Sequence, residues 1–454
     1  MRPNKENEDF NRCFNHRRYV NPLTFTKLKL CIVSSGDFFS DYGGGQVYVR
    51  NIVDEFCRRQ DVSIFVISFC KDQASGTRKY KSIDVFLVNS EQSLRDTLSW
   101  TKPDIVHANG EKLLTARLCK ERNIPCIVTA HHGGIVCPAG ALLNSNDEIC
   151  RIPADYNHCL KCYLRNTPTG LFWYPLLKHY SQNHYCRIGK TLEKLPTVPF
   201  LTPIGRTGLI VTQKIKDWQE LAVTATHFIA PSNAMAEALE RNGCPSSKIT
   251  VIPHGIPEIE YQNSKFKIQN TKFINFYYVG RINYIKGIHV LLKAFSSIDN
   301  PNIELHLIGG IGNKAEQRYQ NKLKRKYQKD KRIIWHGKVP SGQIPDIIKN
   351  YHCLVHPAIY LEVFGLNISE ALSQNKFIIA TRCGGAEMQI KDRQNGWLVA
   401  PNDVNELQKA MSKYCLEKSH LSCTERKPIS IVEHVESLIS IYKNAYIKES
   451  NRIL

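Results

Sequence analysis

The chain has 454 residues, of which 42% are hydrophobic and 22% charged, and this composition is that of an ordinary globular protein. No stretch approaches the roughly 18 uninterrupted apolar residues of a transmembrane helix, so a membrane-spanning protein is not expected. The length predicts more than one domain.

The charge balance is 61 Lys and Arg against 41 Asp and Glu, a net charge of +20. An anionic partner is therefore plausible, either a phosphorylated ligand or an acidic membrane surface, and a merely solvated basic surface is an equal alternative. No nucleic-acid-binding signature accompanies the charge, so nucleic acid is not an expected partner.

Residues 1–27 are polar and basic, lack the apolar run of a secretory signal, and are expected to form an extension before the first strand. The chain also contains 16 cysteines. In a long chain without a signal peptide they indicate a reducing compartment, so a cytoplasmic protein is expected, with a peripheral position at the inner face of the membrane in view of its charge.

From residue 28 onward, short runs rich in Ile and Val alternate with segments that have helical spacing. Near-continuous apolar runs are typical of parallel strands buried on both faces. Residues 28–257 are expected to form one domain of this kind. The segment 137–213 breaks the pattern and is predicted to be an irregular insertion in that domain.

Residues 258–270 are polar, lack periodicity and are predicted to be a linker. The alternation then resumes over residues 271–430, and residues 431–454 are predicted to form a helix that packs back on the first domain. Strand–helix alternation on both sides of a linker predicts an α/β protein of two doubly wound, Rossmann-like domains. Ligands of such domains bind outside the carboxyl ends of the strands, so the facing domains would form a central cleft.

Two loops in this pattern suit a diphosphate. Gly280 and Arg281 end a predicted strand, and Lys286 follows just before a helix, where a guanidinium, an ammonium and a helix N-terminus combine. The run Gly43–Gly45 after the first strand would let the backbone approach phosphate closely, although it lacks the full dinucleotide fingerprint. Either loop alone is also compatible with an ordinary solvated turn.

The stretch EVFGLNISE places Glu362 in a loop before a predicted helix that starts at Phe364, and Glu370 nearly two turns into it. The two carboxylates then lie on different faces and would serve different parts of one ligand. The amides of Phe364, Gly365 and Leu366 would point at the cleft, where sugar or phosphate oxygens could accept from them. The alternative is a capping glutamate and a solvated one.

Together these motifs resemble one family. The Gly43–Gly45 run, VTAHH, IAPS, VIPHG, the spacing Gly280-Arg281…Lys286-Gly287, LHLIGG and the E-x7-E of residues 362–370 occur in the order found in retaining glycosyltransferases of the GT-B fold, family 4. The resemblance covers roughly residues 28–420. The chain departs from the pattern at Val363, where glycine is common, and at His254 and Pro257, which replace the usual Asn and Asp.

The resemblance implies roles for these residues. Arg281 and Lys286 would hold the donor diphosphate, Glu370 the ribose and Glu362 the hydroxyls of the donor sugar. His131 would line the sugar site near the reacting bond, although a strand-end histidine can also be purely structural. The implied catalytic residues are His131, Arg281, Lys286 and Glu362. The implied donor-binding residues are Gly44, Gly45, Gly280, Arg281, Lys286, Glu362, Phe364, Gly365, Leu366 and Glu370.

The implied reaction moves a sugar from a nucleoside-diphosphate sugar to an acceptor hydroxyl with retention of configuration, in the assembly of a cell-surface polysaccharide or lipopolysaccharide. The acceptor would be a carbohydrate or a lipid-linked molecule. No catalytic cofactor is expected, because cationic side chains can stabilise the leaving diphosphate in place of a divalent metal. The alternative is a catalytically silent sugar-nucleotide-binding subunit of the same fold.

Four cysteines gather within the predicted insertion: Cys137, Cys150, Cys159 and Cys162. The C-x2-C spacing of the last two is common among chelating pairs, and four thiolates suit a tetrahedral structural zinc. Such a metal would stabilise a polar segment and hold it on the acceptor side of the cleft, away from the donor. An iron–sulfur cluster, a redox pair or four free thiols are the alternatives.

Overall fold

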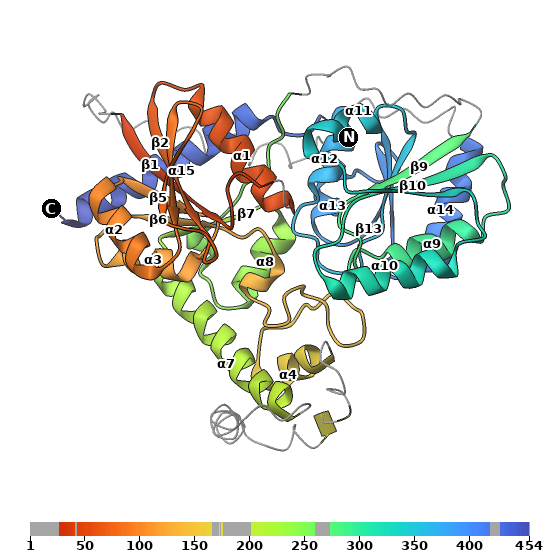
Figure 1. Cartoon of the computed structure of the whole chain (residues 1–454), viewed down its shortest axis with the longest axis horizontal. Coiled ribbons are helices and arrows are strands. Elements are labelled where there is room, and N and C mark those ends of the chain that lie inside the picture. The colour runs from red at the N-terminus through yellow and green to blue at the C-terminus, as the bar shows by residue number, and fades with distance from the viewer. Residues whose placement is uncertain are drawn as a thin grey trace, which may run out of the picture.

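The structure is a computed structural model that describes residues 27–40, 43–165, 172, 174–175, 201–258, 273–417 and 427–453. These residues form two α/β domains that lie side by side (Figure 1). Strands and helices alternate on both sides of residue 258, which confirms the predicted fold class. Most of the predicted extension 1–27 and linker 258–270 lies outside the described residues.

The first domain is built on a sheet whose core strands are continuous apolar runs. Its strands are Leu28–Ser35 (β1), Val62–Phe69 (β2), Gly76–Tyr80 (β3), Ile83–Val88 (β4), Ile105–Ala108 (β5), Cys126–Thr129 (β6), His227–Ala230 (β7) and Ile249–Val251 (β8). Their order across the sheet is β3-β4-β2-β1-β5-β6-β7-β8. Neighbours pair in parallel, apart from the antiparallel pair of β3 with β4 at one edge.

Helices cover both faces of this sheet, so β1, β5 and β6 are buried on both sides. Helices α1 (Gly43–Cys57) and α15 (Ile431–Ile453) pack on one face around a shared apolar cluster. Helices α2 (Glu91–Thr101), α3 (Lys112–Lys120), α7 (Leu201–Thr224) and α8 (Asn233–Arg241) cover the other. Figure 1 shows α15, which follows the second domain in sequence, passing behind β1 and β5 of the first domain.

The second domain repeats this plan with a sheet in which all described neighbours are parallel. Its strands are Ile274–Val279 (β9), Ile303–Ile308 (β10), Ile333–Gly337 (β11), Cys353–His356 (β12), Phe377–Thr381 (β13) and Gly396–Val399 (β14). They lie in the order β11-β10-β9-β12-β13-β14. One face carries α9 (Ile288–Ser296), α10 (Lys314–Lys326) and α14 (Val404–Glu417), and the other α11 (Ile344–Ile348), α12 (Leu366–Ser373) and α13 (Gly385–Gln389).

The chain returns to the first domain at a tight crossing near Gly255. Ile256 exchanges backbone hydrogen bonds with the segment before α15: its N–H donates to Ile429 O (3.1 Å), and the N–H of Ile431 donates to its carbonyl (2.8 Å). A Cβ at Gly255 would lie 2.5 Å from the Cβ of His434, so this approach needs glycine. His434 then donates from Nδ1 to Pro253 O (2.7 Å) and accepts from the Tyr48 hydroxyl at Nε2 (2.9 Å).

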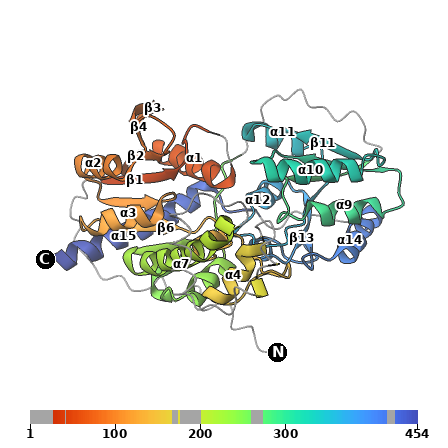
Figure 2. The same ribbon diagram turned by 60° about the horizontal axis from the view of Figure 1, so that its bottom comes forward.

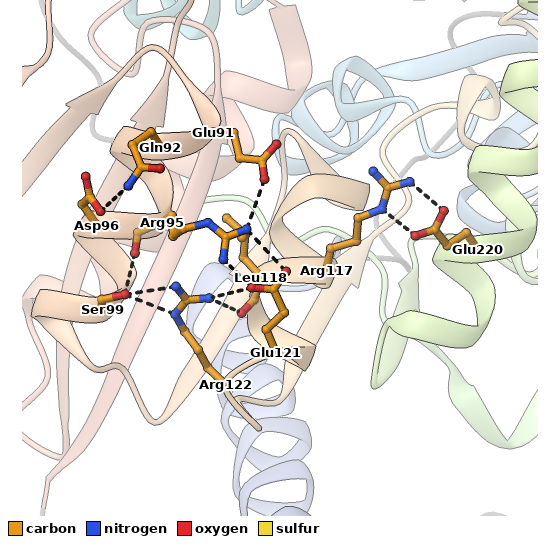
Figure 3. A network of polar contacts seen from close by, with 10 residues as sticks. All are labelled: Glu91, Gln92, Arg95, Asp96, Ser99, Arg117, Leu118, Glu121, Arg122 and Glu220. Carbon is orange, nitrogen blue, oxygen red and sulfur yellow. Dashed lines mark hydrogen bonds and ion pairs between the residues drawn. The ribbon is translucent and has the colours of Figure 1, made fainter.

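Ion pairs tie α2, α3 and α7 together on the surface of the first domain (Figure 3). Arg95 on α2 pairs with Glu121, which follows α3, at 2.5 Å. Arg117 on α3 forms a bidentate ion pair with Glu220 on α7, with distances of 2.5 and 2.6 Å. Because these side chains are solvent-exposed, water and salt screen the pairs, and they contribute little to stability.

The predicted insertion is more ordered than its sequence suggested. Residues 156–165 form α4 (Tyr156–Arg165), and α7 begins at Leu201, so both stretches are helical where an irregular segment was expected. Apolar residues three or four apart on α4 form a small buried cluster with Val211 of α7, and Figure 2 brings these two helices forward, side by side. The polar segment that carries the cysteines therefore contains a small apolar cluster of its own, formed with α7. None of the described helices is both long and apolar enough to cross a bilayer.

Candidate donor site in the interdomain cleft

The strand orders predict where ligands bind. In each sheet the order reverses beside the first strand of the domain, between β1 and β5 and between β9 and β12. The loops that leave the carboxyl ends of two such strands diverge to opposite faces and open a crevice. In the second domain these loops carry residues 280–287 and 357–365, which include most of the predicted donor-binding residues.

Lys286 and Glu362 meet at this crevice, although 76 positions separate them in sequence. The Lys286 ammonium donates a hydrogen bond to Glu362 Oε2, and its charge lies 5.2 Å from the ring centroid of Tyr360. The Tyr360 hydroxyl donates to the same Glu362 oxygen (2.8 Å), and His356 Nε2 lies 3.6 Å from it. One oxygen of the carboxylate is therefore occupied by protein groups.

Electrostatics keeps this pair ionised. Burial would raise the pKa of Glu362, but the Lys286 ammonium, His356 and the hydrogen bonds from Lys286 and Tyr360 together outweigh burial and hold that pKa below its ordinary value. Burial likewise opposes charge on Lys286, and the Glu362 carboxylate raises the Lys286 pKa above its ordinary value. The adjacent His356 stays neutral, because burial lowers its pKa to about 4.

Arg281 has a different environment from Lys286. Its side chain is 57% exposed, and its guanidinium lies 3.8 Å from Glu316, a residue in the first turn of α10. The strand end before it is tightly built: Gly280 has φ +150°, and a Cβ on Gly309 would lie 1.7 Å from its carbonyl oxygen. The exposed guanidinium is thus free to reorient toward a ligand, whereas the backbone that carries it is held firmly.

Glu370 lies in α12, which begins at Leu366 and not at Phe364 as predicted. Gly365 precedes the helix with φ +85°, a conformation that favours glycine. Burial raises the pKa of Glu370 to about 7. Within the described part of the chain its carboxylate makes no hydrogen bond or ion pair, unlike that of Glu362. The two glutamates therefore differ in partners and in charge state near neutral pH.

The first domain supplies the opposite wall. Gly43–Gly45 form the first turn of α1, and a Cβ on Gly44 would lie 3.5 Å from Leu366 Cδ1 of the second domain. A Cβ on Gly45 would lie 4.0 Å from the ring of His131. The glycines, His131 and the start of α12 thus face one another across the cleft.

His131 follows β6 and is oriented by the loop after β5. Its Nε2–H donates to Asn109 Oδ1 (2.7 Å), which leaves Nδ1 of the neutral ring as an acceptor. Burial and the neighbouring His254 and Lys112 hold the pKa of His131 well below its usual range. The ring can therefore accept a hydrogen bond from a hydroxyl but does not act as a cation.

His254 and Phe364 close the cleft from its two sides. Their rings lie 5.2 Å apart at 68°, and the His254 ring also lies 5.4 Å from that of His131. His254 Nδ1 is buried without a hydrogen-bond partner in the described structure. His254, which stands where the family pattern has Asn, thus places an aromatic ring at the domain boundary.

The four cysteines of the insertion lie in one region, with Cys159 and Cys162 on α4. Burial raises the pKa of the Cys159 thiol to about 12, and Cys137 and Cys162 add to that shift. Among the described residues, however, no three His, Cys, Asp or Glu side chains are arranged as ligands for one metal ion. The zinc site therefore stays a prediction.

The position of the insertion differs from the expectation that it would stay away from the donor side. Its hairpin, residues 143–149, crosses to the second domain, where Asp147 accepts a hydrogen bond from Tyr284 in the loop between Arg281 and Lys286 (2.9 Å). Sequence reasoning also missed Tyr360, His356 and Glu316. His356 ends the strand before the loop that carries Glu362, and Glu316 lies on a different element from Arg281. Only Tyr360, two positions from Glu362, offered a local signal.

Comparisons with known proteins agree with this fold. Residues 260–428 match the family model described as glycosyl transferases group 1. The chain is 28% identical over 181 residues to the phosphatidylinositol N-acetylglucosaminyltransferase gpi3 subunit of Schizosaccharomyces pombe, covering 39% of this chain and 38% of that protein. It is 22% identical over 225 residues to the putative colanic acid biosynthesis glycosyltransferase WcaL of Escherichia coli, covering 48% and 55%.

A third relative is the lipopolysaccharide 1,2-N-acetylglucosaminetransferase of Salmonella typhimurium, 26% identical over 212 residues, with coverage of 41% and 54%. The chain thus spans about half the length of the curated relatives it matches.

Solved structures share the architecture over nearly the whole chain. Anabaena Alr3699/HepE in complex with UDP superposes with a TM-score of 0.58 at 18% identity, covering 94% of this chain and 99% of that one. Sucrose-phosphate synthase from Thermosynechococcus elongatus gives 0.63 at 15% identity, with coverage of 94% and 98%. The protein therefore has the GT-B glycosyltransferase fold, and its second domain matches the glycosyl transferases group 1.

Proposed function

We propose that this protein is a family 4 glycosyltransferase that moves a sugar from a nucleoside-diphosphate sugar to an acceptor hydroxyl with retention of configuration. The observation that carries the proposal is the Lys286–Glu362 pair at the β9/β12 crevice, opposite His131 and the glycine-rich start of α1. A cation for the diphosphate and a carboxylate for sugar hydroxyls stand side by side there, where the two domains meet.

In the transfer step the bond between the sugar's anomeric carbon and the diphosphate oxygen breaks, and negative charge develops on the leaving diphosphate. Arg281 and Lys286 would stabilise this charge, and a preorganised donor of this kind is typically worth about 10² to 10³ in rate. Because these cations would supply positive charge at the leaving group, the step would need no catalytic metal. The acceptor hydroxyl forms the new bond and loses its proton, for which the departing diphosphate is the proposed base.

The remaining residues would position the donor. Glu362 has one oxygen occupied by Lys286 and Tyr360, and its second oxygen would accept from sugar hydroxyls. Glu370, which has no partner among the described residues, would bind the paired hydroxyls of the ribose. His131 would accept a sugar hydroxyl at Nδ1, and Phe364, Gly365 and Leu366 would bring the start of α12 to the donor.

The acceptor is proposed to be a carbohydrate or lipid-linked molecule in the assembly of cell-surface polysaccharide or lipopolysaccharide. The named functions of the WcaL and lipopolysaccharide N-acetylglucosaminetransferase relatives support this class. We further propose that the protein acts at the inner face of the membrane, where its net charge of +20 would favour binding to acidic lipids.

A thermal-shift screen of UDP-, GDP-, ADP- and dTDP-sugars tests the proposal, because a ligand that binds the folded state raises its unfolding temperature. At least one donor is expected to stabilise the protein, and that donor should then give nucleoside diphosphate and a glycosylated product whose anomeric configuration can be read by NMR. Stabilisation without turnover on any acceptor would favour the silent sugar-nucleotide-binding subunit instead. No stabilisation by any donor would contradict both.

A further inference from the structure

The hairpin of the insertion, residues 143–149, forms an arm that is closed by its own hydrogen bonds. Leu143 and Ile149 form an antiparallel bridge, and Asn144 N–H donates to Glu148 O at 2.8 Å. Inside the turn, Asn144 Oδ1 accepts from the backbone N–H groups of residues 146 and 148. Asp147 has φ +63°, a left-handed turn conformation that Asp adopts more readily than most residues with a Cβ. The turn thus places Asp147 at the tip of the hairpin.

The arm belongs to the first domain but packs on the second. Leu143 lies against the apolar cluster of the second domain that contains Phe276 and Tyr278, and Ile149 packs against clusters of both domains. The apolar contacts fix the arm at the cleft, so the polar contacts at its tip are made across the domain boundary.

Those polar contacts converge on Asp147. Its Oδ2 accepts from Tyr284 (2.9 Å) and from Arg165 Nη2 of α4 (2.6 Å). Arg165 also donates to Asn144 O (3.2 Å), and its guanidinium carbon lies 5.9 Å from the centroid of the Tyr284 ring. The Arg165 guanidinium thus orients the Asp147 carboxylate, which accepts a hydrogen bond from the Tyr284 hydroxyl.

Tyr284 lies in the turn between the two predicted diphosphate-binding side chains. The Tyr284 carbonyl accepts from Gly287 N–H (3.0 Å), and its ring stacks on His289 at 4.5 Å and 6°. The neighbouring Lys286 N–H is held by Asn283 Oδ1 (3.2 Å). Fixing Tyr284 therefore fixes the turn that aims Lys286 at Glu362.

We propose that Asp147 is a positioning residue: through Tyr284 it holds the 281–287 loop of the second domain in the conformation that presents Arg281 and Lys286 to the donor diphosphate. This inference rests on the proposed function. It makes the insertion of the acceptor-side domain part of the donor site, because the arm reaches the phosphate loop from across the cleft.

The test compares nucleotide binding by wild type, Tyr284→Phe, Asp147→Ala and the double variant. Tyr284→Phe keeps the ring and its stack on His289 and removes only the hydroxyl. The matched control is Tyr80→Phe, which removes a similar hydroxyl donated to an aspartate, Asp54 (3.0 Å), at the far edge of the first domain. Calorimetry with UDP, GDP and ADP and with the corresponding monophosphates gives the affinities, and thermal unfolding shows that each variant is folded.

Each single variant is expected to lose about tenfold in affinity for the diphosphate that the wild type binds, since a hydrogen bond to a charged group is lost. Monophosphate affinity should fall much less, and the double variant should lose no more than either single one. Unchanged diphosphate affinity in both variants, or equal losses for mono- and diphosphate, would overturn the inference while leaving the proposed function intact. A wild type that binds none of the diphosphates would instead overturn the proposed function, and the inference with it.

Discussion

The Lys286 ammonium and the Glu362 carboxylate form a buried ion pair that joins the loop after β9 to the loop after β12. Their side chains are 20% and 12% exposed. Each group would be an uncompensated buried charge without the other, so the pair links the stability of the second domain to the donor site.

Removing either partner should therefore destabilise the protein. Lys286→Met or Glu362→Gln alone is expected to lower the free energy of unfolding by about 3–5 kcal/mol at most, because the remaining charge is left buried and unpaired. The double variant should recover most of the loss, since neither charge remains. Urea denaturation of the four proteins measures this, and purely additive losses would show that the two groups do not interact.

Arg281 should behave in the opposite way. Its guanidinium is 57% exposed, so Arg281→Ala is expected to leave the unfolding temperature nearly unchanged. Turnover should nevertheless fall on the order of 10² to 10³, because a group that stabilises the leaving diphosphate is lost. Steady-state kinetics with the donor found by the screen decides this, with Arg78→Ala, an exposed arginine on edge strand β3, as the control. Near-wild-type turnover of the Arg281 variant would remove its assignment to the diphosphate.

The two glutamates should separate in binding and in pH dependence. Glu370→Gln is expected to weaken binding of the bare nucleoside diphosphate, whereas Glu362→Gln should chiefly impair sugar transfer. Because burial raises the folded-state pKa of Glu370 to about 7, the folded protein holds that proton more tightly than the unfolded chain. This contribution to stability is present below the ordinary glutamate pKa and is lost as the pH rises through about 7.

Ribose hydroxyls donate to the ionised form, so nucleotide binding at a pH below about 7 should expel a proton from Glu370. Calorimetry in buffers of different ionisation enthalpy should show this proton release in wild type and in Glu362→Gln, and not in Glu370→Gln. Equal loss of nucleotide affinity in both variants would refute the division of roles.

The cysteine cluster yields a separate prediction. If Cys137, Cys150, Cys159 and Cys162 close one site, protein purified without chelator should contain about one zinc per chain. Cys159→Ser should lower both the zinc content and the unfolding temperature, while Cys70→Ser, a half-buried cysteine outside the insertion, should change neither. A metal-free protein with four freely titratable thiols would exclude the site, and iron with sulfide would identify the cluster alternative.

Membrane association is expected to depend on lipid charge. In sedimentation with liposomes, the protein should bind vesicles that contain acidic phospholipid and leave neutral ones in solution, and added salt should release it. The basic and aromatic segment 171–180 is one candidate contact, although most of it lies outside the described residues. Equal sedimentation with both kinds of vesicle would contradict an electrostatic association.

The sequence predicted the strands and helices of this fold better than the contacts between them. Periodicity and Ile/Val runs identified β1, β9 and β12, and parallel pairing explains why such strands must be apolar on both faces. The loop residues Lys286 and Glu362 were found by resemblance, but their ion pair depends on the strand order at β9/β12, which local patterns do not encode. The start of α12 was misplaced by two residues, since Phe364 has helical spacing but Gly365 takes a left-handed conformation before the helix.

Local sequence patterns predicted less of the structure in the insertion than elsewhere. The apolar stripe of α4 was not recognised because two of its buried positions are cysteines, which were interpreted as metal ligands. The contact of Asp147 with Tyr284 spans 137 positions and two domains, and neither residue stands in a recognisable motif. Such a contact can be identified only from the three-dimensional structure.

The return of α15 to the first domain has a consequence for synthesis of the protein. The apolar cluster beneath α1 contains Val435, Leu438 and Tyr442, so one face of the first sheet cannot be fully covered until the ribosome has made the whole second domain. Domains generally fold as they emerge, the N-terminal one first. Here α1 can cover its part of that face early, but the part beneath α15 is completed only after the second domain has been made.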